Sequence, residues 1–123
     1  MSEHERFCRD GVCLAVRAGE RVSLRGQAGA TPEGGFAGLG DPAVQAEDAM
    51  ANVRILLQQA GGRMADIRKL TTYLTDRAWR EPVEAVVARH LAGAGPVRVG
   101  LIVAGLPRPE MLVMIDVDAV IGG

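Results

Sequence analysis

The last quarter of the chain places one arginine and one aspartate on segments that are otherwise aliphatic. Arg98 lies within the run VRVGLIVA at 97–104, and Asp116 lies within VMIDVDAVI at 113–121. The planar guanidinium of an arginine can bind a small carboxylate through two parallel hydrogen bonds. A nearby aspartate can hold or polarise a water molecule. Together, Arg98 and Asp116 predict a site that holds a carboxylate-bearing molecule beside a reactive water.

A structural role is the alternative interpretation of these two charges. Arg98 and Asp116 could form an ion pair between subunits, and ion pairs of that kind are common without catalysis. Pattern alone favours this interpretation over catalysis, and it assigns Asp118 a structural role as well.

The two segments that carry these charges alternate residue by residue, which is typical of β-strands. We expect them to form a hairpin whose aliphatic face packs on helices, with these inward positions: Val97, Val99, Leu101, Val103, Val113, Ile115, Val117, Ala119 and Ile121. The second face then carries Arg98, Gly100, Ile102, Met114, Asp116 and Val120. That face is too apolar to remain in water and too charged to form a core. The pattern therefore predicts a symmetric oligomer in which the charged positions line clefts between subunits.

Alternation and helical spacing divide the remainder of the chain into further elements. Strands are expected at 11–17, 21–25 and 69–74, with a glycine-rich loop over 26–41. A first helix over 41–60 has Asp41 as its cap and Pro42 in its first position, and Gly61 ends it. A second helix is expected over 79–91. The order ββαβαββ predicts an α+β fold, with a mixed sheet and two helices packed on one face.

Length and composition favour a single domain that needs neither disulfides nor metals. The chain has 123 residues, of which 48% are hydrophobic, and its net charge is −1. Residues 1–10 are expected to be an irregular lead-in to one domain at 11–123. The charge does not favour a nucleic-acid partner, and no apolar run is long enough to cross a membrane. The polar N-terminus predicts a cytoplasmic protein.

The cysteines and histidines do not predict a metal site. The chain has two cysteines, Cys8 and Cys13, and two histidines, His4 and His90, which lie far apart in the sequence. These are too few to indicate zinc, and both cysteines are expected to be reduced thiols.

Three stretches of the chain resemble the Rid family of reactive intermediate (enamine/imine) deaminases, which are also called YjgF-like proteins. The stretches are RGQAG at 25–29, QAEDAMANVRILLQQAGGRMADIRKLTTYLTD at 45–76 and PVRVGLIVAGLPRPEMLVMIDVDAV at 96–120. The resemblance extends from about Gly11 to Ile121. It implies a chorismate-mutase-like α+β fold and a homotrimer with clefts between the subunits, which is the kind of oligomer that the second face requires.

The resemblance also implies an activity and its residues. In the deaminases of this family, an arginine that matches Arg98 binds the carboxylate of 2-aminoacrylate or a related 2-imino acid. Asp116 matches the position of a glutamate that assists the attacking water, and the products are a 2-oxo acid and ammonia. No metal or organic cofactor is needed. The resemblance places four further residues at the substrate cleft: Gly26, Arg25, Gly100 and Glu84.

Several of these positions depart from the family pattern. Arg25 stands where a serine or similar small residue is usual, Glu84 stands for an asparagine, and Val12 stands for a tyrosine. Asp116 is one methylene shorter than the usual glutamate. These departures leave two alternatives to the deaminase. One is a non-catalytic trimer that binds a small carboxylate metabolite in the same cleft. The other is a different hydrolytic or isomerising reaction there.

Overall fold

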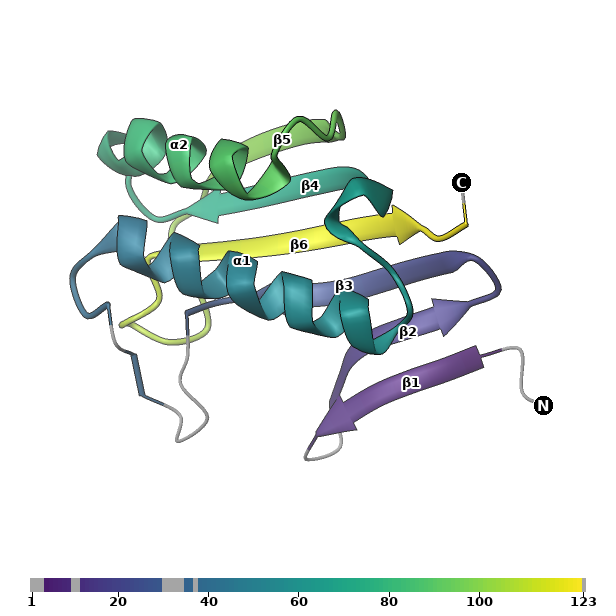
Figure 1. Cartoon of the computed structure of the whole chain (residues 1–123). Coiled ribbons are helices and arrows are strands. Elements are labelled where there is room, and N and C mark those ends of the chain that lie inside the picture. The colour runs from purple at the N-terminus through teal and green to yellow at the C-terminus, as the bar shows by residue number, and fades with distance from the viewer. Residues whose placement is uncertain (1–3, 10–11, 30–34, 37, 123) are drawn as a thin grey trace.

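The protein consists of two layers, a twisted β-sheet and a pair of helices that covers one face of it (Figure 1). The computed structural model describes residues 4–9, 12–29, 35–36 and 38–122. Its strands are β1 (His4–Arg9), β2 (Val12–Ala18), β3 (Arg21–Gln27), β4 (Ile67–Leu74), β5 (Val97–Ile102) and β6 (Val113–Val120). The helices are α1 (Pro42–Gln59) and α2 (Arg80–Leu91), with short 3-10 turns η1 (Met64–Asp66) and η2 (Arg77–Trp79). The predicted α+β fold with both helices on one face is confirmed.

The two ends of the chain pair differently from what the sequence predicted. Across the described strands the order is β1-β2-β3-β6-β4-β5. Residues 4–9 form β1 and pair with β2, so the expectation of an irregular lead-in there is wrong. The prediction that the last two strands form a hairpin is wrong as well. Strand β6 lies between β3 and β4, and β5 pairs in parallel with β4 at the sheet edge. Helix α2 is the crossover that parallel pairing of β4 and β5 requires.

Local signals set both ends of α1 as the sequence predicted. The Asp41 side chain accepts a hydrogen bond from the backbone N–H of Val44 at 3.1 Å, and Pro42 occupies the first turn. At the other end, Gly61 adopts a positive φ of 89°. The backbone N–H of Gly61 donates to the Gln58 carbonyl at 3.0 Å, and that of the next residue donates to the Leu57 carbonyl at 2.7 Å. These bonds form a Schellman motif, which is why the helix ends at this glycine.

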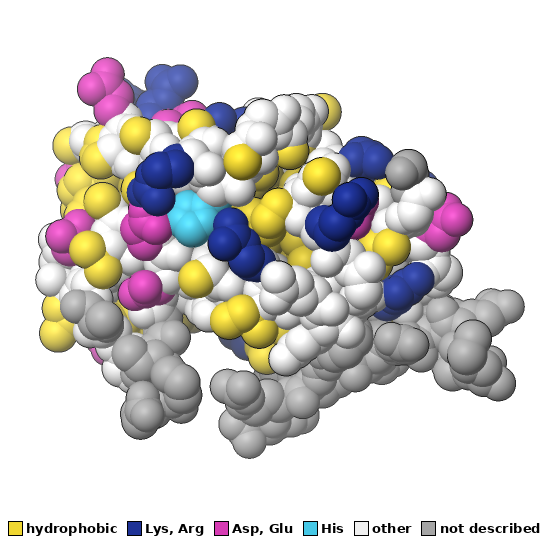
Figure 2. Space-filling model, viewed as in Figure 1, with side chains coloured by type: hydrophobic (Ala, Val, Ile, Leu, Met, Phe, Trp, Pro, Cys, Tyr) yellow, Lys and Arg dark blue, Asp and Glu magenta, His cyan; other side chains and the backbone are white. Residues whose placement is uncertain are grey.

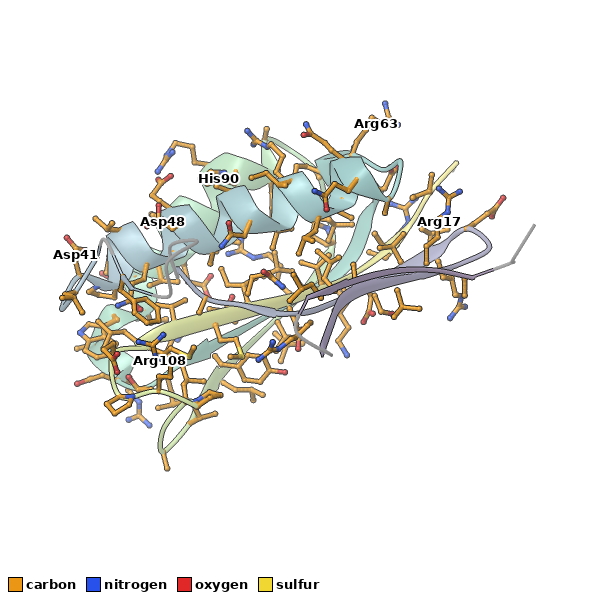
Figure 3. The ribbon with its side chains drawn as sticks, turned by 90° about the horizontal axis from the view of Figure 1, so that it is seen from below. Arg17, Asp41, Asp48, Arg63, His90 and Arg108 are labelled. Carbon is orange, nitrogen blue, oxygen red and sulfur yellow. The ribbon has the colours of Figure 1, made fainter. Side chains whose placement is uncertain are left out.

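Strand β6 lies in the middle of the sheet and supplies its inward side chains to the core. Val113, Ile115, Val117 and Ala119 are all buried, as their alternation predicted. They pack beneath α1 and α2, whose buried residues include Met50 of α1 and Val83 of α2. Figure 3 shows both helices on the same side of the sheet. The opposite face, which none of the described helices covers, is here called the open face.

The edge strand β5 does not orient its aliphatic side chains as expected. Arg98 of β5 lies beside Leu70 of β4, which is fully buried under the helices. Val97, Val99 and Leu101 therefore point to the open face, where Val97 is 65% and Leu101 45% exposed. The prediction that these side chains pack on helices is wrong. The register with β4 sets the orientation of an edge strand, and a shift of one residue exchanges its two faces.

Two side-chain groups connect the layers and the helices. The fully buried amide of Gln45 donates to the carbonyls of Gly38 and Glu110 at 3.1 and 2.9 Å, and accepts from the backbone N–H of Leu112 at 2.8 Å. Between the helices, Glu47 of α1 contacts His90 of α2 at 2.7 Å and also pairs with Arg89. Figure 2 shows a histidine among basic and acidic side chains on this face. Neither described helix combines the length and the hydropathy that a membrane span requires.

Candidate functional site

Arg98 and Asp116 lie on opposite faces of the sheet. Asp116 of β6 pairs with Thr71 of β4, whereas Arg98 of β5 pairs with Leu70. Leu70 and Thr71 are consecutive, and consecutive side chains of a strand point to opposite faces. Arg98 is therefore on the helix side and Asp116 on the open face. The expectation that both share one face is wrong, and a single copy of the chain cannot bring them together.

Arg98 lies in a pocket at the free edge of the sheet, which we call the edge pocket. Its volume is about 450 Å³, and it lies between β5 and the segment that runs from η2 into α2. The side chains that matter for its chemistry are those of Leu74, Arg77, Arg80, Glu84, Arg98 and Ile102. Positive charge and apolar surface therefore meet in one small concave space, as in many small-molecule sites.

Three of the predicted site residues meet in the edge pocket. The Arg98 Nη2 donates to Glu84 Oε2 at 3.1 Å and is 3.5 Å from the Glu84 carbonyl oxygen. A Cβ on Gly100 would lie 3.7 Å from Glu84 Oε1, so the Glu84 carboxylate extends over this glycine. Among the described residues Arg98 donates only through Nη2, which leaves Nη1 and Nε for a ligand. The arrangement can bind a second carboxylate beside Gly100.

Asp116 has a different partner on the open face, the hydroxyl of Tyr73. The Tyr73 Oη donates to Asp116 Oδ2 at 2.8 Å. This hydrogen bond is the main cause that raises the pKa of Tyr73 above its ordinary value, with burial and the negative charge of Asp116 contributing less. The bond fixes one carboxylate oxygen, and within the described part of the chain no donor reaches Oδ1, which is therefore available to a water molecule. Tyr73 and Asp116 are called the open-face pair below.

The remaining predicted residues belong to the β3 end of the open face. A Cβ at Gly26 would overlap the sulfur of Met114, so a larger residue here would force the Met114 side chain to move. Met114 and Asp116 are two residues apart on β6 and share the open face. Arg25 is exposed, and its carbonyl accepts a hydrogen bond from the Gln27 amide at 2.7 Å. The predicted site thus divides into two half-sites, one in the edge pocket and one on the open face.

Sequence reasoning missed three residues of these half-sites: Tyr73, Arg77 and Arg80. Arg77 and Arg80 are three residues apart, but Arg77 precedes the helix predicted over 79–91. Helical spacing would have placed them on one side only if that helix had been extended back by two residues. Tyr73 could not be assigned to Asp116 without the register between β4 and β6. Among the described residues, no group of three or more His, Cys, Asp or Glu side chains could hold a metal ion.

Comparison with known proteins shows which sequences this chain is similar to. Residues 12–121 match the pattern of a family described as endoribonuclease L-PSP. Protein DfrA from Myxococcus xanthus is 31% identical over 107 residues, which cover 87% of this chain and 79% of that protein.

Solved structures show the same fold. A member of the YjgF/YER057c/UK114 family from Mycobacterium tuberculosis has a TM-score of 0.84 and 29% identity, over 96% of this chain and 99% of that one. RidA from an Antarctic Psychrobacter has a TM-score of 0.83 and 27% identity, over 98% of this chain and 97% of that one.

Proposed function

The chain belongs to the endoribonuclease L-PSP family, whose structures include the YjgF-like and Rid proteins, and on that premise we propose that it is a cytoplasmic hydrolase of 2-imino acids. Its products are the 2-oxo acid and ammonia. The observation that carries the proposal is Arg98, which lies in a pocket beside Gly100 and whose Nη1 and Nε donate to none of the residues that the structure describes. An arginine in that setting suits the carboxylate of a 2-imino acid, because its fork fixes both position and orientation.

The reaction needs positioning and one oriented water. The oxygen of water adds to C2 of the imine, the C2–N bond then breaks, and the two hydrogens of the water leave with the nitrogen as ammonia. Arg98 binds the substrate carboxylate and so places C2 next to Gly100. Asp116 accepts a hydrogen bond from the water at Oδ1, while Tyr73 holds Oδ2. Holding two reactants in attack geometry accounts for acceleration of this kind.

The two half-sites require more than one copy of the chain. Because Arg98 and Asp116 lie on opposite faces, we propose a homotrimer in which the edge pocket of one copy meets the open face of the next. The open face carries exposed Val97 and Leu101 at its edge, and apolar surface of this kind is typical of a face that a partner covers. Light scattering should give three times 13.0 kDa, about 39 kDa. A fully active monomer would contradict the arrangement.

A mixing experiment tests the shared site directly. Arg98→Ala lacks the edge-pocket half-site and Asp116→Asn lacks the open-face half-site, so each variant alone should be nearly inactive. Equal mixing of the two, by unfolding and refolding together, leaves about one interface in four with both native half-sites. About a quarter of wild-type activity should therefore return. If each copy contained a whole site, mixing would restore nothing.

The activity itself is measured by competition with a chemical trap. An amino-acid oxidase generates the imine in place, and semicarbazide captures whatever imine survives. Wild-type protein should reduce the captured product, whereas Arg98→Ala should leave it unchanged. Asp116→Asn should be nearly inactive, but it should still bind 2-oxo acids, because the carboxylate clamp is intact.

A non-catalytic trimer that binds a small carboxylate is the second candidate. The observation in its favour is that Glu84 already forms a hydrogen bond with Arg98 and Asp116 forms one with Tyr73. The side chain of Asp116 is also one methylene shorter than the glutamate that assists the water in the family. This candidate predicts that 2-oxo acids bind to wild type and not to Arg98→Ala in calorimetry. It also predicts that wild type never competes with semicarbazide for any imine in a broad panel.

A further inference from the structure

The edge pocket carries more positive charge than a single carboxylate can balance. Arg77 of η2 and Arg80 of α2 line it together with Arg98 of β5. Among its described lining residues Glu84 is the one acidic side chain. Three positive charges and one negative charge leave an excess of two. A ligand with two negative charges would neutralise the pocket, whereas a monocarboxylate would leave one positive charge unbalanced.

The two additional arginines are available to a ligand. Both Arg77 and Arg80 are exposed, and within the residues described neither forms an ion pair with a carboxylate. The other arginine of the pocket, Arg98, is paired with Glu84. Guanidinium groups that face a pocket without a protein partner are suited to an anion from outside the chain.

The backbone that carries these arginines is held in place at both ends of η2. The Asp76 side chain accepts a hydrogen bond from the backbone N–H of Ala78 at 2.8 Å. Trp79 is partly buried and packs against the core. Arg77 and Arg80 therefore project from a fixed turn, so less conformational entropy is lost when they bind a ligand than on a mobile loop.

The floor of the pocket suits a short hydrocarbon chain between two acidic groups. Leu74 is buried at the end of β4, and Ile102 at the end of β5 is 46% exposed. These side chains line the pocket together with the arginines of the η2–α2 segment and Arg98. A ligand with a carboxylate at each end could place its methylene groups against them.

From these observations we propose that the substrate is a 2-imino acid with a second carboxylate at the end of its side chain. Arg98 binds the carboxylate beside the reacting carbon, and Arg77 and Arg80 bind the distal one. The chemistry rests on the proposed function, in which imine and water give a 2-oxo dicarboxylate and ammonia. The charge preference itself rests only on the pocket.

Binding of two matched product analogues tests the charge preference. 2-Oxoglutarate and 2-oxopentanoate have the same number of carbons and differ in the distal carboxylate. Calorimetry on the whole protein should give a Kd at least about fivefold lower for 2-oxoglutarate, a size expected for exposed ion pairs. The ratio should fall as salt is raised, because exposed charges are screened. A ratio near one at low salt would overturn the proposal.

Variants assign the preference to the two arginines. Arg77→Gln and Arg80→Gln should each lower the ratio of the two affinities, and the double variant should bring it close to one. Arg68→Gln removes an exposed arginine outside the pocket and should keep the wild-type ratio. A wild-type ratio that persists in the double variant would overturn the assignment. So would a double variant that instead loses the trimer mass, because the arginines would then serve an interface.

The trapping assay separates this proposal from the proposed function. Imines are generated from D-aspartate and D-glutamate with one oxidase, and from D-alanine and D-norvaline with another. Wild type should suppress trapping more strongly for the dicarboxylic imines. Suppression that is equal or stronger for the monocarboxylic imines refutes the substrate class and leaves the deaminase intact. No suppression for any imine, together with tighter binding of 2-oxoglutarate, refutes the deaminase and retains a dicarboxylate-binding pocket.

Discussion

Replacement of Gln45 by methionine should destabilise the protein by about 3 kcal/mol. The side chain is fully buried and makes three hydrogen bonds to backbone groups, at Gly38, Glu110 and Leu112. Methionine has nearly the same length and fills irregular space well, so little of the loss should come from packing. Each hydrogen bond contributes about 1 kcal/mol net, so the loss of all three gives about 3 kcal/mol.

The measurement is urea unfolding at one fixed protomer concentration, since assembly adds to apparent stability. With a slope of about 2 kcal/mol per molar, the midpoint should fall by about 1.5 M while the slope stays the same. Gln59→Met is the matched control, because Gln59 is exposed on the same helix. Its effect should remain within about 0.5 kcal/mol. If Gln45→Met costs less than about 1 kcal/mol, the three bonds do not hold the segment before β6.

Tyr73 is the chain's one tyrosine, so absorbance at 295 nm follows it alone. Its hydrogen bond to Asp116 raises its pKa, and Asp116→Asn should lower the native titration midpoint. Because the folded state favours the protonated phenol, this contribution to stability is complete below the ordinary pKa and is lost as pH rises through the raised one. Gly61→Ala should lower the free energy of unfolding by about 1–2 kcal/mol in thermal unfolding, since φ at Gly61 is 89°. Gly95→Ala is the control, because a Cβ there would meet open space, and its effect should stay within about 0.5 kcal/mol. Asp41→Ala should cost about 1 kcal/mol by loss of the α1 cap and Asp41→Asn much less, and equal losses in the two would contradict the capping role.

Much of the fold could be predicted from the sequence because its signals are local. The bounds of α1 follow from Asp41, Pro42 and Gly61, which act within a few residues of the helix ends. The inward side chains of β6 follow from strict alternation on a strand that is paired on both sides. The sequence alone does not predict the contact of Arg98 with Glu84 and Gly100. The family resemblance predicts only that the three residues line one cleft.

The tertiary structure alone decided how the site is divided. The alternation of a strand shows that neighbouring side chains point to opposite faces. It does not show which set of side chains faces the helices. On β5 apolar residues occur in both sets, Val99 in one and Ile102 in the other, so hydrophobicity could not fix the phase. Pairing with β4 fixed it, and this pairing turned Arg98 toward α2 and away from Asp116. The open-face pair of Tyr73 and Asp116 has the same origin, since residues 43 apart in the chain become neighbours only when the strand register is set.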